Sequence, residues 1–237
     1  MKWTQVTDIG LTRLINEDSL CVCPEIELFA VADGMGGHQA GEIASRLALQ
    51  VIEQELKNRL PETSDPSAVL LEAVKGANEA LFQAARRKPE WRGMGTTVTA
   101  CLKRDDELIS AHVGDSRAYL IRKETIVQLT EDHTLVHELV KNGGISREQA
   151  YFHPQRNVLT RALGTEPVVA VDLRRTRVTP RDLLLLCTDG LTAYLRKEEI
   201  LALLKSAPGL EASAGTLLRE ALARGGADNI TIVLVEF

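Results

Sequence analysis

Three aspartates share a local setting that suits the binding of a cation. Asp33 and Asp189 each follow an apolar, strand-like run and precede a glycine, and Asp228 lies in a glycine-rich turn before the last apolar run. If these strand ends meet, the carboxylates crowd together at a cost of several kcal/mol for each unpaired buried charge. They would then take up protons or bind a cation. Oxygen ligands favour magnesium, manganese or calcium over zinc.

The residues around Asp33 predict a strand, a tight corner and a helix. An apolar strand over 28–32 runs into Asp33, and a glycine-rich corner follows over 34–37. At a glycine-rich corner the backbone can approach a ligand closely, so a carboxylate there is suited to binding a cation. The alternative is a connection in which Asp33 only caps the turn. The helix that follows has apolar residues on one 3.6-period face: Ala40, Ile43, Ala44, Leu47 and Val51.

The elements that would position these residues do not alternate between strand and helix. Three strands come first, and the short turns between them predict that they are antiparallel neighbours. In order, the chain predicts strands at 3–9, 19–23 and 28–32, helices at 38–60 and 67–86, a strand meander at 96–102, 108–113, 118–122 and 126–129, strands at 168–178 and 183–187, helices at 197–206 and 210–224, and a strand at 230–235. Because the run 183–187 is apolar on both faces, we expect two packed antiparallel sheets with helix pairs outside, an α+β fold.

One segment departs from this regular pattern. Between Thr134 and Gly164 the periodicity weakens, although residues 135–140 look helical. Long irregular segments inside a compact domain are usually functional or mobile. The chain shows no internal repeat and no long linker, so we expect a single domain over 1–237.

Composition limits the classes of partner. The chain has 237 residues, 44% hydrophobic and 26% charged, with a net charge of -5. This balance is typical of a globular domain and offers no broad basic surface for nucleic acid or an anionic membrane. The first residues lack the form of a signal peptide, and the four cysteines lie in apolar runs without a C-x-x-C pair. We expect a cytoplasmic protein with buried free thiols, monomeric by default.

Eight short motifs, spread along the whole chain, carry a resemblance to a known family. The chain resembles the metal-dependent PP2C-type Ser/Thr protein phosphatases in their compact bacterial form. Each motif alone is weak, but their number and order are specific. The motifs are Arg13-x-x-Asn16-Glu17-Asp18; Val31-Ala32-Asp33-Gly34-Met35-Gly36-Gly37; Gly95-Thr96-Thr97; His112-Val113-Gly114-Asp115-Ser116-Arg117; Leu129-Thr130-x-Asp132-His133; Leu159-Thr160-Arg161-Ala162-Leu163-Gly164; Cys187-Thr188-Asp189-Gly190-Leu191; and Gly226-x-Asp228-Asn229-Ile230-Thr231.

The resemblance implies a four-layer α-β-β-α sandwich and a site with two Mn²⁺ or Mg²⁺ ions, with a third ion in many members. Asp33 matches the aspartate that bridges two ions, and Gly34 the residue whose backbone carbonyl binds the second ion. Asp189 and Asp228 match the other ligands of the first ion. Asp115 matches a ligand, shared with Asp189, of the third ion. These assignments follow from the family's pattern at these positions.

The resemblance also implies how a phosphate would be held and attacked. Glu17 and Asp18 match acidic residues that act through metal-bound water, and Arg13 matches the arginine that grips the substrate phosphate. A water between two divalent ions is deprotonated at neutral pH and attacks the phosphorus in line. The segment 142–164 corresponds to the family's flap, which makes Arg156 and Arg161 candidate substrate contacts.

One position departs from the pattern of many eukaryotic members. They carry a histidine, a proposed general acid, directly after Asp-Gly, where this chain has Met35. Methionine cannot donate a proton, so the leaving group would be protonated by water, a metal-bound water or another residue. His38 is close in sequence, but a polar residue at the start of a helix is more often a cap.

The implied function is hydrolysis of phosphoserine and phosphothreonine in proteins, opposing bacterial Ser/Thr kinases. The partners would be kinases and their phosphorylated substrates. Two alternatives remain open: a pseudophosphatase that binds phosphoproteins without turnover, and a stress-signalling phosphatase that acts on anti-anti-sigma-type proteins. A cysteine phosphatase is excluded because no cysteine has an arginine six residues later, and the phosphate-loop, HExxH and GxSxG motifs are absent.

Overall fold

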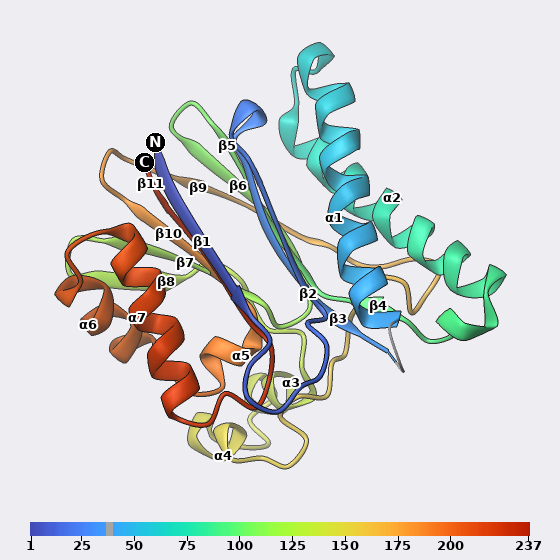
Figure 1. Ribbon diagram of the computed structural model, residues 1–237. Helices are drawn as coiled ribbons and strands as arrows, with labels where there is room; N and C mark the ends of the chain where they lie inside the picture. Colours follow the sequence, from blue (N-terminus) through green and yellow to red (C-terminus); the bar gives the residue numbers. More distant parts are fainter. Residues whose placement is uncertain (37–39) are drawn as a thin grey trace.

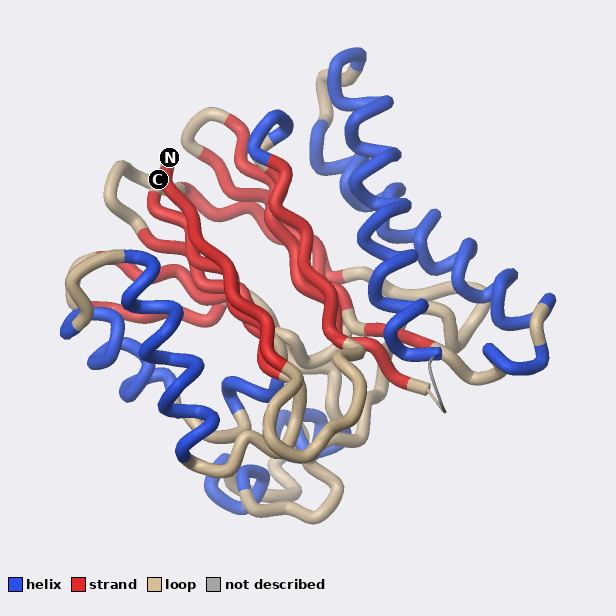
Figure 2. Tube along the Cα trace, viewed as in Figure 1, coloured by secondary structure: helices blue, strands red, loops and turns tan. Residues whose placement is uncertain are grey.

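Two antiparallel sheets pack face to face between two layers of helices (Figures 1 and 2). The computed structural model describes residues 1–36 and 40–237. The first sheet has the order β1 (Lys2–Asp8), β11 (Ile230–Glu236), β10 (Leu183–Cys187), β7 (Arg117–Arg122) and β8 (Thr125–Gln128). The second has the order β2 (Asp18–Cys23), β3 (Leu28–Met35), β5 (Val98–Arg104), β6 (Glu107–Val113) and β9 (Asp172–Arg177), and the short β4 (Gly95–Thr96) pairs with β3. The predicted four-layer fold is confirmed.

Each sheet is covered on its outer face by a pair of long helices. The helices α1 (Ala40–Arg59) and α2 (Pro66–Arg87) cover the second sheet, and α6 (Lys197–Ser206) and α7 (Leu210–Ala223) cover the first (Figure 1). Short helices complete the described chain: η1 (Pro24–Ile26), η2 (Leu60–Glu62), η3 (Pro89–Trp91), α3 (Leu135–Lys141), α4 (Arg147–Tyr151) and α5 (Asp189–Thr192).

Strand β10 shows why an apolar run on both faces indicates the middle of such a sandwich. Leu184 and Leu186 face the core between the sheets. Leu185 and Cys187 face the core beneath α6 and α7. Successive side chains of a strand point to opposite faces, so one strand contributes to two apolar cores at once.

Two predicted groupings of strands are wrong, for the same reason. Strand β1 pairs with β11, in register from Lys2 opposite Glu236 to Asp8 opposite Ile230, and so lies in the other sheet from β2 and β3. The predicted meander is also divided, because β5 and β6 lie in the second sheet and β7 and β8 in the first. A short connection can cross between packed sheets as easily as it can form a hairpin, and the strand pattern does not distinguish the two. Both crossings, at 9–17 and 114–116, reach the same end of the sandwich (Figure 1).

The strand after Ala32 is longer than predicted. Gly34 and Met35 pair with Thr96 and Gly95, so β3 continues through the first part of the expected corner. The rest of that corner includes Gly37, which lies outside the described residues. A Cβ at Gly34 would lie 2.0 Å from the carbonyl oxygen of Gly41, which shows how closely the strand approaches α1.

The predicted buried face of α1 is displaced from the observed one. Ile43, Leu47 and Val51 are only partly buried, at the margin of the core. Alanines at every fourth position let the helix lie close to its neighbours, and α1 packs against both the sheet and α2. The fully buried line of the helix is Ala40, Gly41, Ala44, Ser45, Ala48, Leu49, Ile52 and Leu56.

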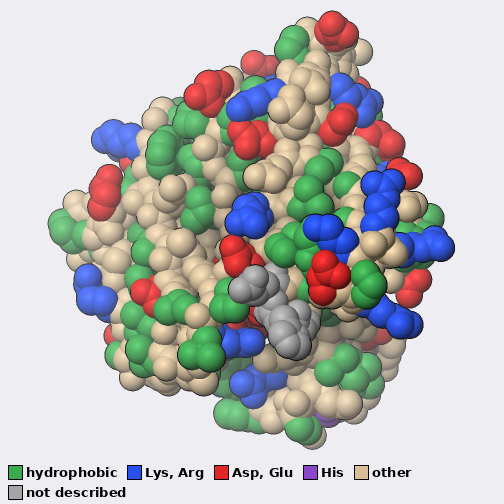
Figure 3. Space-filling view, turned by 45° about the vertical axis from the view of Figure 1, so that its right-hand side comes forward, with side chains coloured by type: hydrophobic (Ala, Val, Ile, Leu, Met, Phe, Trp, Pro, Cys, Tyr) green, Lys and Arg blue, Asp and Glu red, His purple; other side chains and the backbone are tan. Residues whose placement is uncertain are grey.

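The face of the molecule in Figure 3 agrees with the composition. Acidic and basic side chains are interspersed over the coloured part of the face in Figure 3. All four cysteines are free and buried, as predicted. Within the described residues, we find no helix with the length and apolar character needed to cross a membrane.

Two glycine-to-alanine substitutions test the close approach of β3 and α1. In the first turn of α1, a Cβ at Gly41 would lie 2.2 Å from Glu17 Oε1 and 2.9 Å from the carbonyl carbon of Gly34. We expect Gly41→Ala to lower the free energy of unfolding by about 1–3 kcal/mol. Gly76→Ala in α2 meets no atom within 4 Å, so it should raise stability by about 0.5–1 kcal/mol. Thermal melts in EDTA measure both, and equal melting temperatures would contradict the packing described.

Candidate active site

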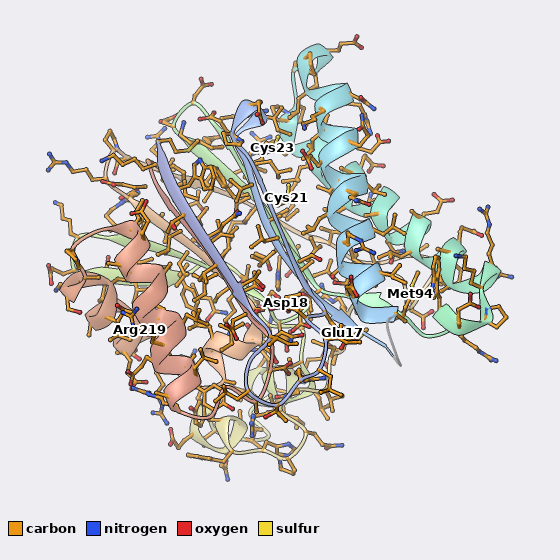
Figure 4. The ribbon with its side chains drawn as sticks, in the orientation of Figure 1. Glu17, Asp18, Cys21, Cys23, Met94 and Arg219 are labelled. Atoms are coloured by element: carbon orange, nitrogen blue, oxygen red, sulfur yellow. The ribbon has the colours of Figure 1, made fainter. Side chains whose placement is uncertain are left out.

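Five aspartates from both sheets meet at one end of the sandwich. Asp18 and Asp33 are direct cross-strand neighbours in the second sheet. Asp189 follows β10 and Asp228 precedes β11 in the first sheet, and Asp115 lies on the crossing between β6 and β7. Figure 4 shows Asp18 beside Glu17 where the ends of the two sheets come together. The predicted convergence of strand ends is therefore present in the structure.

The charges of this cluster act strongly on one another. Burial raises the pKa of Asp33 well above its ordinary value, and the carboxylates of Asp18, Asp189, Asp115 and Asp228 raise it further. Burial, followed by the charge of Asp228, raises the pKa of Asp189 to about 6. Burial also raises the pKa of Asp18 to about 7, against the hydrogen bonds that it accepts. Like charges at such a site favour protons or a bound cation.

Three oxygen atoms of this cluster are buried and accept no hydrogen bond within the described residues: Glu17 Oε1, Asp18 Oδ1 and Asp189 Oδ1. An ionised oxygen that is buried without a donor is costly. A hard divalent cation together with its bound water would satisfy these oxygens, and an all-oxygen donor set suits Mg²⁺ or Mn²⁺. As the side chains stand, no three His, Cys, Asp or Glu residues in the described ranges are gathered tightly enough to hold an ion. The donor chemistry nevertheless fits such an ion.

Arg13 is the cation that the structure places in this cluster. Its Nη2 donates to Asp228 Oδ2 at 2.8 Å, and its Nη1 lies 4.0 Å from Glu17 Oε2. The side chain is 48% exposed, on a loop whose Leu11 N–H donates to the carbonyl of Gly226 at 2.7 Å. The predicted phosphate-binding arginine is therefore next to the predicted metal ligands, and it is paired with one of them.

A buried asparagine holds this loop in place, and no role was predicted for it from the sequence. Asn229 Oδ1 accepts from the N–H of Glu17 at 2.8 Å, and its Nδ2 donates to the carbonyls of Ile9 and Ile15 at 2.9 and 3.1 Å. One amide thus fixes the crossing that carries Arg13 and Glu17. The sequence feature that could have indicated this role is its position between Asp228 and a buried strand, where a polar side chain needs hydrogen-bond partners.

Threonine hydroxyl groups support the two aspartates of the second sheet. Thr188 Oγ1 donates to Asp18 Oδ2 at 2.8 Å and accepts from the N–H of Thr231 at 3.0 Å, which links the two sheets. Thr97 Oγ1 accepts from the N–H of Asp33 at 2.9 Å, and Thr96 Oγ1 donates to its carbonyl at 2.8 Å. These bonds hold the backbone and one oxygen of the acidic cluster in place.

A histidine network supports the crossing that carries Asp115. The N–H of Gly114 donates to His133 Nδ1 at 3.0 Å, so His133 Nε2 carries the proton that faces Asp172 Oδ2 at 3.2 Å. Arg161 Nη1 donates to the other oxygen of Asp172 at 2.8 Å. The structure therefore places Arg161 in an ion pair at the root of the flap, and its predicted contact with substrate stays a prediction.

A cleft opens beside the cluster, and we call it the flap cleft. Its volume is about 860 Å³, and Asp115 and Asp189 of the cluster are among the residues that line it. Its walls come from β7, β8, α3, α4 and the residues from Asp189 to Lys197. The predicted flap contact Arg156 lines it. Arg117 also lines the cleft. Its Nε donates to Asp132 Oδ1 at 2.9 Å, and its Nη2 donates to Asp132 Oδ2 at 2.5 Å.

Comparison with known proteins agrees with the motifs and the fold. A sequence profile of the family described as Protein phosphatase 2C matches residues 12–224. The serine/threonine phosphatase stp of Listeria welshimeri is 40% identical over 235 residues, covering 97% of this chain and 93% of that protein.

Solved structures give the same result. The crystal structure of the Mycobacterium tuberculosis serine/threonine phosphatase PstP/Ppp superposes with a TM-score of 0.93 at 39% identity, covering 100% of this chain and 98% of that chain. The catalytic domain of PstP in complex with two manganese ions superposes with a TM-score of 0.89 at 37% identity, covering 99% and 97% of the two chains. The chain therefore belongs to the protein phosphatase 2C family of serine/threonine protein phosphatases.

Proposed function

We propose that this phosphatase hydrolyses phosphoserine and phosphothreonine at a pair of Mn²⁺ or Mg²⁺ ions and opposes bacterial Ser/Thr kinases. The observation that carries the proposal is the set of buried carboxylate oxygens without hydrogen-bond donors where the two sheets meet. The related PstP domain, solved with two manganese ions, supports the same site. Its substrates would be phosphorylated proteins, including kinases and their targets, and the phosphatase domain would comprise residues 1–237.

The proposed ion ligands come from both sheets. Asp33 would bridge the two ions, because it lies among all the other carboxylates of the cluster. Asp189 and Asp228 would complete the first ion's protein ligands, and the carbonyl of Gly34 would bind the second. Asp115, which lines the flap cleft with Asp189, would hold a third ion. Two divalent ions lower the pKa of a water between them and neutralise phosphate charge.

The remaining polar groups would orient water and substrate. Glu17 and Asp18 each have a buried oxygen without a donor, so they can accept hydrogen bonds from water beside the ions. Arg13 has the planar fork that binds two phosphate oxygens. Because it is paired with Asp228 in this structure, an ion on Asp228 would release the guanidinium for the phosphate.

The leaving group also needs a proton, and the side chain of Met35 cannot donate one. His38 lies outside the described residues. His112 and His133 have both ring nitrogens in hydrogen bonds to Thr99, Glu131, Gly114 and Asp172. Neither of these two rings therefore has a nitrogen free for substrate, and water is the donor that this arrangement favours.

Removing a proposed ligand tests the role of the ions. We expect Asp189→Asn, and EDTA treatment of the unaltered protein, to lower hydrolysis of a phosphothreonine peptide by at least about 100-fold. The matched control is Asp106→Asn, an exposed carboxylate that pairs with Arg177 at 3.2 Å on the β5–β6 turn; its activity should be unchanged. Full activity in EDTA or in Asp189→Asn would disprove the mechanism.

The raised pKa values of Asp18 and Asp189, about 7 and about 6, predict how Mn²⁺ binding depends on pH. The pKa values of these two carboxyl groups are higher in the folded protein than in the unfolded chain, so the folded protein binds protons more tightly. These protons stabilise the metal-free fold at low pH, and this stabilisation is lost as the pH rises through 6 to 7. Mn²⁺ must displace the same protons. We therefore expect Mn²⁺ to raise the melting temperature more at pH 7.5 than at pH 5.5, with proton release measurable by calorimetry at pH 6. An equal effect at both pH values would contradict this coupling.

The Arg13–Asp228 pair gives a test that separates phosphate binding from metal binding. We expect Arg13→Gln to lower kcat/KM for a phosphopeptide by about 10- to 100-fold, because a charged fork on the phosphate is lost. Mn²⁺ affinity, measured by calorimetry, should stay the same or increase, since Asp228 loses its partner. Arg86→Gln, on α2, is the control for the loss of one positive charge. Weaker Mn²⁺ binding with unchanged KM would contradict the assignment.

A further inference from the structure

We propose that the flap cleft binds the substrate polypeptide beside the phosphoresidue and selects for acidic side chains there. This inference rests on the proposed function and assigns a substrate preference to the same site. Asp115 and Asp189 belong to the carboxylate cluster and also line the cleft, so the cleft adjoins the place where the phosphoresidue would lie. A volume of about 860 Å³ lies in the upper part of the range for clefts that bury whole ligands.

The charge of the cleft is the main evidence. Five basic residues line it: Arg117, Lys141, Arg147, Arg156 and Lys197. Arg117 and Lys141 are neutralised within the cleft by Asp132 and Glu131, at 2.5 and 2.9 Å. Among the described residues, no acidic group lies within ion-pair distance of the other two arginines, and the lysine reaches only its neighbour Glu198, at 3.8 Å. The cleft thus presents cations that its own acids do not neutralise.

The other two carboxylates of the cleft do not cancel this charge when the ions are bound. Asp115 and Asp189 line the cleft, and both are proposed ligands of divalent ions. With the ions bound, the charge that remains unneutralised in the cleft is positive. Complementary charge raises the rate of encounter and sets preference among partners, so acidic side chains are the chemistry that fits.

The wall that carries these cations is held in place. Tyr151 Oη donates to the carbonyl of Ala193 at 3.3 Å. The guanidinium of Arg196 lies 4.8 Å from the centre of the Tyr151 ring and donates to Glu148 Oε1 at 3.1 Å. These contacts tie α4, which begins at Arg147, to the start of α6. A preformed wall loses less conformational freedom on binding.

The apolar part of the cleft lining indicates a polypeptide. Val136, Val140, Ala150 and Tyr151 line the cleft together with the cations. Apolar side chains with a few charged groups around them are the lining that buries a peptide's side chains. A phosphate ester without a peptide chain would leave these apolar side chains uncovered.

The test compares phosphothreonine peptides of equal length. One carries three glutamates before the phosphoresidue, one carries them after it, and one carries glutamines at all these positions. We expect one glutamate peptide to exceed the glutamine peptide in kcat/KM by about three- to tenfold. The double variant Arg147→Gln/Lys197→Gln should lose this advantage and keep its rate on p-nitrophenyl phosphate within about twofold. The loss should appear in KM, and added salt should reproduce it.

The control is Arg86→Gln/Arg219→Gln, which removes the same charge from α2 and α7; Figure 4 shows Arg219 on the outer helical layer. It should retain the preference for glutamate. Equal kcat/KM for all three peptides, or a preference that persists in the cleft variant, would overturn the inference. These failures leave Mn²⁺-dependent hydrolysis of p-nitrophenyl phosphate intact, whereas failure of the proposed function would abolish the dependence on Mn²⁺ itself.

Discussion

Repulsion among buried carboxylates is the constraint around which this molecule is built. Asp18 and Asp33 come from one sheet, and Asp189 and Asp228 from the other, so the sheets can pack only by bringing like charges together. The apolar core between the sheets, which contains Phe29 and many aliphatic side chains, supplies the opposing free energy. A cation bound by carboxylates of both sheets would replace this repulsion with an attraction between the sheets. Metal binding and packing of the sheets would then stabilise each other.

The groups that hold the acidic cluster are neutral, and this is physically reasonable. Asn229, Thr188 and Thr97 fix backbone and side-chain atoms through ordinary hydrogen bonds. A charged partner in their place would compete with an ion for the carboxylates, as Arg13 does at Asp228. Neutral hydroxyl and amide groups position the acids and leave their charge available. Arg13, which does compete for Asp228, lies on a loop and has a half-exposed side chain.

Local patterns predicted much of the fold and site, and long-range pairing explains the rest. Because β10 is apolar on both faces, the sequence indicated two packed sheets. The aspartates next to glycines indicated which strand ends come together. The pattern of β1 could not show that it joins β11, because an alternating strand fits either sheet. Asn229 lay in a recognised motif, yet its three partners come from residues 9–17, more than 200 positions away. The α1 face was misjudged because that helix is buried on two sides.

The pairing of β1 with β11 has a consequence for how the protein is made. Lys2 lies opposite Glu236, and the N and C ends of the ribbon lie side by side in Figure 1, so the first sheet joins residues from the two extremes of the described chain. Contacts of such high sequence separation form slowly, and during synthesis the N-terminal strand must wait for its partner to leave the ribosome. Asp228, which directly precedes β11, arrives at the same moment. The cluster of five aspartates is therefore complete only when β11 is paired, because Asp228 directly precedes that strand.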